Sequence, residues 1–119
     1  MATFTKNILS GSTDGKGILV TQTVTAGTLL HTGPTNTAQF HEVWLYAVNT
    51  SASNVKLTVE WGEATAPNGN IEFTVNAENG LYLIVPGLIL KGNATALTVR
   101  AFAATGSVVV IHGYVNQIA

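Results

Sequence analysis

The sequence predicts an all-β fold: a single antiparallel β-sandwich of about eight strands, jelly-roll-like, preceded by an N-terminal arm. Short runs that are apolar, or alternately apolar and polar, recur about every ten residues, with glycine, proline and asparagine between them. No run of more than six residues combines helical apolar spacing with a capping residue, so essentially no helix is expected. With 119 residues and no internal repeat, the chain fits one domain. A seven-stranded immunoglobulin-like sandwich is the alternative architecture.

The first ten residues are predicted to form the arm, and residues 11–119 the sandwich. Phe4, Ile8 and Leu9 are the apolar members of the arm, which can add an edge strand or extend to a neighbouring molecule. The arm lacks the apolar core of a signal peptide, so synthesis in a cytoplasm is expected.

The central element is predicted within residues 42–61. Residues 43–48 are apolar on both faces of a strand, which is typical of a strand covered on both sides. Residues 55–61 alternate, with Glu60 on the polar side, and this pattern favours a half-solvated strand. The polar linker 50–54 is short, so we expect these two strands to pair as a hairpin.

The other strands follow from the same patterns, and each is bounded by turn residues. The turns at residues 77–80 and 104–106 are short enough for hairpins. The predicted strands cover residues 18–24, 28–32, 70–76, 81–90 with a bend at Pro86, 95–103 and 107–118.

Charged side chains are scarce: only 9% of residues are Asp, Glu, Lys or Arg, whereas 46% are hydrophobic and the net charge is −1. Typical soluble domains carry roughly 25% charged residues. Depletion of charge is a feature of obligate interfaces, so we predict that much of the surface is buried in an assembly. The balance of charges predicts no nucleic-acid or membrane partner, and the lack of cysteine excludes a disulfide framework.

No sequence motif predicts catalysis, a cofactor or a metal site. His31, His41 and His112 do not have the spacing of metal ligands, and the glycine-rich residues 11–17 lack the pattern of a phosphate loop. We therefore expect no enzyme, no cofactor and no bound metal.

Two further groups of side chains have alternative interpretations. Glu60 and Glu72 are the minimum set for glycoside hydrolysis, but solvated charges on polar strand faces are the simpler interpretation. Five aromatic side chains could form a sugar-binding surface, which would suit a carbohydrate-binding module, but a place in the core or in a subunit interface is the preferred interpretation. They are Trp44, Tyr46, Trp61, Tyr82 and Tyr114.

Three stretches carry a resemblance to a known class: HEVWLYAVNTSASNVKLTVEWG, LYLIVPGLIL and LTVRAFAATGSVVVIHGYVNQI. They resemble small virion proteins of tailed bacteriophages and fit the capsid decoration, or cement, class. The resemblance implies a β-rich trimer on the capsid exterior that bridges capsomers, with the major capsid protein as its partner. It transfers no functional residues. Phage tail and head-fibre proteins share the same composition and remain an alternative role.

The resemblance makes the segments outside the alternating strands candidates for contact with the capsid or with other subunits. These are the arm and the loops 33–40 and 62–69. The predicted contact residues are Phe4, Ile8, Leu9, Pro34, Phe40 and Pro67.

Overall fold

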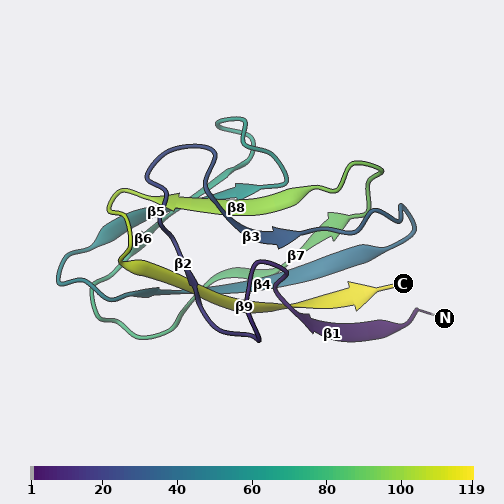
Figure 1. The fold of residues 1–119 in the computed structure, drawn as a ribbon, viewed down its shortest axis with the longest axis horizontal. Coiled ribbons are helices and arrows are strands. Elements are labelled where there is room, and N and C mark those ends of the chain that lie inside the picture. Colours follow the sequence, from purple (N-terminus) through teal and green to yellow (C-terminus); the bar gives the residue numbers. More distant parts are fainter. Residues whose placement is uncertain (1) are drawn as a thin grey trace.

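The computed structural model describes residues 2–119, and within them it contains nine β-strands and no helix. Residue 1 of the predicted arm lies outside the described residues. The strands form two antiparallel sheets, which Figure 1 shows edge-on as two layers. Sheet A has the order β1 (Phe4–Ile8), β9 (Val109–Ile118), β4 (Phe40–Asn49), β7 (Tyr82–Lys91), and the short β2 (Ile18–Leu19) also pairs with β9. Sheet B has the order β3 (Thr28–Thr32), β8 (Thr98–Ala103), β5 (Val55–Trp61), β6 (Asn70–Val75).

The connectivity is that of a jelly roll. From β2 onward, every connection crosses from one sheet to the other, except that β5 and β6 pair within sheet B. The all-β sandwich with jelly-roll-like connections is therefore confirmed, and the strand order differs from that of the immunoglobulin-like alternative. The two chain ends lie side by side, because the Thr3 N–H donates to the Ala119 carbonyl at 2.8 Å.

The predicted hairpin across residues 42–61 is wrong, since β4 lies in sheet A and β5 in sheet B. The hairpins expected at residues 77–80 and 104–106 are wrong for the same reason, because those turns also cross between the sheets. At the β4–β5 crossing, the buried Asn49 side chain donates to the Ser53 and Val75 carbonyls at 2.8 and 2.9 Å. A short polar linker is compatible with either connection, and packing of the inner faces of β4 and β5 decides between them.

The predicted strand at residues 18–24 is also shorter than expected. Only Ile18 and Leu19 pair as a strand, with β9. The chain then leaves sheet A and reaches sheet B, where the Ala103 N–H donates to the Gln22 carbonyl at 3.1 Å. Similarly, β8 begins at Thr98 rather than at residue 95.

The core lies between the two sheets and is built from the inward side chains of their longer strands. Leu45 and Leu57 are fully buried there, and so is Leu9, which follows β1. Burial of one such side chain contributes about 1.5–3 kcal/mol. The other buried apolar residues are Ile18, Val20, Leu30, Val43, Ala47, Val55, Val59, Val75, Val85, Leu90, Val99, Ala101, Ala103, Val109, Ile111 and Val115.

Two predictions about strand faces are wrong. We expected β4 to be covered on both sides, but its outward side chains, among them Trp44 and Tyr46, are half-buried, and no described strand or helix packs above them. We expected the polar side of β5 to be solvated, but Thr58 and Glu60 are buried. The apolar face that the sequence assigned to the interior therefore lies on the surface of the single chain.

Candidate functional site

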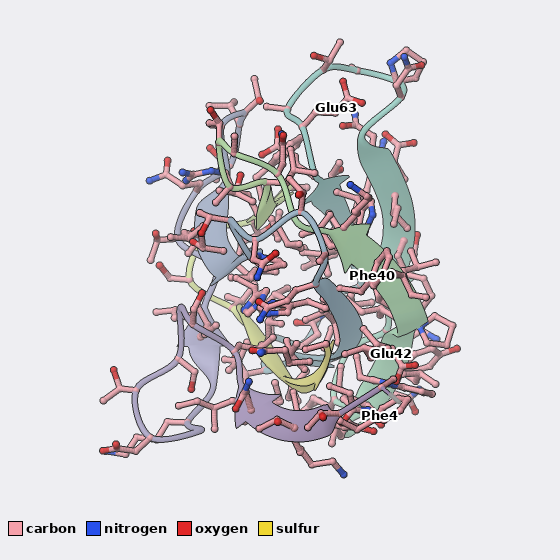
Figure 2. The ribbon with its side chains drawn as sticks, turned by 90° about the vertical axis from the view of Figure 1, so that its right-hand side faces the viewer. Phe4, Phe40, Glu42 and Glu63 are labelled. Atoms are coloured by element: carbon pink, nitrogen blue, oxygen red, sulfur yellow. The ribbon has the colours of Figure 1, made fainter. Side chains whose placement is uncertain are left out.

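The largest candidate site is the outer face of sheet A. Residues that pair directly across antiparallel strands point to the same side of a sheet, so the register defines this face. Across β1, β9, β4 and β7 its rows are Phe4–Ile118–Phe40–Lys91, Lys6–Asn116–Glu42–Ile89 and Ile8–Tyr114–Trp44–Pro86. Figure 2 shows Phe4, Phe40 and Glu42 on one side of the molecule, far from Glu63 in the β5–β6 loop.

We call the part of this face that β1, β9 and β4 supply the aromatic face, formed by Phe4, Lys6, Ile8, Phe40, Trp44 and Tyr114. Large apolar side chains are exposed here: Phe4 at 68%, Ile8 at 50% and Phe40 at 36%. Several large exposed apolar side chains on one face of a sheet are a feature of interaction sites.

The centre of the aromatic face is held in place by its own contacts. The rings of Trp44 and Tyr114 stack with centroids 6.0 Å apart and an interplanar angle of 10°. The Trp44 indole N–H donates to Glu42 Oε1 at 2.7 Å, and Asn116 Nδ2 donates to the same oxygen at 2.9 Å. These two hydrogen bonds, first that from Trp44, lower the pKa of Glu42. Lys6 Nζ lies 4.7 Å from the Tyr114 ring centroid, in cation–π geometry.

Gly87 of β7 makes this arrangement possible. Its φ is +78°, and a Cβ atom at this position would lie 2.9 Å from the Trp44 ring. A side chain here would be strained and would displace the indole from its contact with Glu42.

The second candidate surface is the β7 rim, formed by Leu81, Tyr82, Leu83, Leu88 and Ile89. β7 is an edge strand of sheet A that exposes apolar side chains on both of its sides, Ile89 at 56% on one and Leu88 at 41% on the other, and Leu81, which precedes it, is 58% exposed. Pro86 and two register shifts in the β4–β7 pairing interrupt the regularity of this edge. Such features are typical of edges that do not accept a further strand.

The structure brings together three of the six predicted contact residues and separates the others. Phe4, Ile8 and Phe40 lie together on the aromatic face. Leu9 is in the core at 1% exposure, and Pro34 is also buried, so the prediction that these two side chains contact a partner is wrong.

Pro67 is exposed, but it lies in the β5–β6 loop of sheet B, away from the aromatic face. For Trp44 and Tyr114 the sequence left the core and a subunit interface open, and the six predicted contact residues include neither of them nor any residue of the β7 rim. The signal was the strand with two apolar faces, which we interpreted as covered on both sides.

Two of the three histidines form a buried pair between the sheets. His31 Nε2 of β3 and His41 Nδ1 of β4 are 2.8 Å apart. The Ser10 N–H donates to His31 Nδ1 at 3.0 Å, so His31 carries its proton on Nε2 and donates to His41. Burial, and then the neighbouring His41, lower the pKa of His31 to about 4. Burial also lowers the pKa of His41, although a hydrogen bond with Gln117 opposes this effect. Among residues 2–119 there is no cluster of three metal-ligating side chains.

Glu60 anchors the β2–β3 loop on the outer side of sheet B. Its carboxylate accepts hydrogen bonds from the Gly27 N–H at 2.7 Å and from the Thr25 hydroxyl at 2.5 Å. A cavity of about 240 Å³ lies above it, between residues 23–25 and residues 64–66. The sequence pattern led us to expect a solvated side chain at Glu60. The structure shows instead that Glu60 is only 1% exposed and holds the loop in place. Glu72 is exposed and pairs with Lys56 at 3.0 Å, as a solvated charge would.

Comparisons with protein-family models, with curated proteins and with solved structures found no match. No helix capable of crossing a membrane occurs in residues 2–119. The functional assignment therefore depends on the surfaces described above and on the sequence resemblance.

Proposed function

We propose that this protein is a structural component of a tailed-phage virion that attaches to the capsid exterior and stabilises it by bridging capsomers. The observation that carries the proposal is the uncovered apolar surface formed by the aromatic face and the β7 rim. The segments that resemble phage decoration proteins supply β4, β5, β7, β8 and β9. In this proposal the major capsid protein is the partner, and the protein is made in the host cytoplasm.

The proposed mechanism is mass action. A protein that binds the assembled shell, but not its separated subunits, shifts the equilibrium toward the shell. An oligomer, for which a trimer is the expectation, presents several copies of each contact, and their linkage raises the apparent affinity. A rigid sandwich suits this role because little conformational freedom is lost on binding.

The test uses empty shells assembled from the major capsid protein that is encoded together with this protein. Co-sedimentation should show saturable binding, and the temperature at which the shells disassemble should rise. Val24→Glu is the control for substitutions on the aromatic face or the β7 rim, and it should bind the shells as the wild type does. Val24 is 63% exposed in the β2–β3 loop and belongs to neither surface. If tens of micromolar protein neither co-sediments nor changes the disassembly temperature, the proposal is refuted.

A second experiment distinguishes decoration of the capsid from a role in the tail or in a head fibre. Purified virions labelled with an antibody against this protein should show the label over the capsid surface by electron microscopy. A label confined to the tail or to a single fibre would replace the decoration role with one of these alternatives.

A second candidate function is glycan binding, favoured by the parallel, half-buried rings of Trp44 and Tyr114. Flat aromatic pairs of this kind provide apolar surface to a sugar ring. Binding of the purified protein to immobilised glycans that is abolished by Trp44→Ala would support it, whereas unchanged binding by that variant would exclude this platform.

A further inference from the structure

We propose that Asn79 is a site of spontaneous deamidation just before the β7 rim, and that the fold protects Asn68 from the same reaction. The sequence contains two Asn–Gly steps, Asn68–Gly69 and Asn79–Gly80. Asparagine before glycine is thermolabile, because the glycine nitrogen has no Cβ beside it to block its approach to the asparagine side chain. Since both steps have the same reacting pair, a difference between their rates reports the fold.

The reaction needs only the chain and water. The backbone nitrogen of Gly80 loses its proton and attacks the side-chain carbonyl carbon of Asn79. The new C–N bond closes a succinimide ring, and the bond to the side-chain nitrogen breaks, so that ammonia leaves with the proton. A water molecule then opens the ring at either carbonyl. The product is aspartate, or isoaspartate with one more methylene in the main chain, and both carry a negative charge that asparagine lacks.

The fold leaves the step at Asn79 open to this attack. Asn79 and Gly80 are exposed in the connection between β6 and β7. Gly80 has a φ of +70°, and beyond its chain neighbours no atom would lie within 4 Å of a Cβ at this position. The Gly80 N–H donates to no backbone carbonyl among residues 2–119, so the attack breaks no backbone hydrogen bond of this group.

The step at Asn68 is held closed. Gly69 is buried, and its N–H donates to the Thr65 carbonyl at 2.9 Å. Its own carbonyl accepts the Trp61 N–H at 2.7 Å, and a Cβ on Gly69 would clash with the Glu63 carbonyl oxygen. The Gly69 nitrogen therefore reacts only after this loop opens, whereas the other step needs no such opening.

The position of Asn79 gives the modification a consequence, and this part rests on the proposed function. Leu81 is the first residue of the β7 rim, and Tyr82 begins β7 by pairing with Ala47. The Tyr82 ring centroid lies 5.1 Å from that of Phe73. Deamidation places a carboxylate beside this apolar surface, and a contact that must desolvate a new charge is weaker. Aged protein should therefore bind capsid shells less tightly than fresh protein.

The experiment compares the two sites within one chain. Wild-type protein is incubated for weeks at 37 °C and pH 7.4, both folded and unfolded in guanidinium chloride, and is then digested with a protease that cuts after glutamate. Cleavage after Glu72 separates the two asparagines, and tandem mass spectrometry detects the gain of about 1 Da at each. In the folded protein Asn79 should convert at least tenfold faster than Asn68, which corresponds to about 1.4 kcal/mol in activation free energy. In guanidinium chloride the two rates should be comparable.

Three results would overturn the inference. The first is equal conversion of the two sites in the folded protein, and the second is a folded protein in which Asn79 does not convert. The third is a preference for Asn79 that persists unchanged in guanidinium chloride, because the cause would then be the neighbouring residues in sequence and not the fold.

The consequence for binding is tested with Asn79→Asp, which supplies the charge of the product, and with Asn68→Asp as the matched control. In the co-sedimentation assay N79D should bind shells at least tenfold more weakly than the wild type, a loss of about 1.4 kcal/mol, whereas N68D should bind as the wild type does. Equal binding by N79D overturns the consequence. A wild type that binds no shells refutes the proposed function, and the consequence with it, while the deamidation rates, measured without shells, still decide the site.

Discussion

Acid should destabilise this protein between pH 6.5 and pH 4, because the buried His31–His41 pair resists protonation. His31 is 3% exposed, donates from Nε2 to His41 and accepts the Ser10 N–H at Nδ1. A second proton on His31 would have to reside on Nδ1, where it would face the Ser10 N–H, so two donors would oppose each other. Protonation therefore breaks the contact between the Ser10 N–H, which follows β1 of one sheet, and His31 in β3 of the other.

The sign and the size of the effect follow from the pKa of His31. Its pKa is about 4 in the folded protein, compared with 6.5 as the ordinary value, so the unfolded chain binds the proton more readily. The contribution is complete above about pH 6.5, is lost as the pH falls from 6.5 to 4, and does not change further below 4. The two pKa values correspond to about 3 kcal/mol in total, of which about 2 kcal/mol is lost at pH 5. The lowered pKa of His41 acts in the same direction.

The assay is urea unfolding at pH 8, 6.5, 5 and 4, followed by tryptophan fluorescence at a single protein concentration. His31→Gln should remove most of the pH dependence between 6.5 and 5, a range in which carboxyl groups contribute little. His112→Gln is the matched control, because His112 lies on the outer side of sheet A and outside the pair. A wild-type free energy of unfolding that is constant from pH 7 to pH 5, or a slope that persists in H31Q, would refute this reasoning.

Three further predictions concern stability. Glu60→Ala should lower the free energy of unfolding by about 2–3 kcal/mol, because it leaves the Gly27 N–H without its buried acceptor. Glu60→Gln should lower it by less. A loss in the exposed control Glu72→Gln as large as that in Glu60→Ala would contradict this prediction. Leu45→Ala should cost about 2–5 kcal/mol in urea unfolding, whereas Leu88→Ala, at an exposed site, should cost well under 1 kcal/mol if the chain is studied as a monomer. Deleting residues 2–8 removes β1 alone, but deleting residues 2–10 also removes a core leucine, so we expect the longer deletion to lower the melting temperature by several degrees more; equal melting temperatures would show that this leucine is dispensable.

Part of the candidate site could be predicted from the sequence. Phe4, Ile8 and Phe40 are isolated large apolar residues outside the predicted core strands, and the structure exposes all three. Leu9 and Pro34 have the same local signature but are buried. The neighbouring residues in sequence do not distinguish these outcomes, because burial depends on what packs above each position.

Local sequence patterns did not predict which polar side chains are buried. Glu60 lies on the polar side of an alternating strand, which predicts exposure, yet a loop 33–35 residues earlier in the chain covers it. His31 and His41 likewise have no ligand spacing or motif, and only the packing of β3 against β4 brings their rings together.

The sequence alone determined the all-β class, the approximate strand positions and the absence of predicted helix, because alternation of side chains is a property of residues adjacent in the chain. Only the tertiary structure decided which strands pair, that β4 and β5 lie in opposite sheets, and which apolar face of β4 stays open. A short polar linker fits a hairpin and a crossing equally well, so the choice is made by contacts between segments far apart in sequence. The uncovered face on which the proposed function depends is a consequence of that choice.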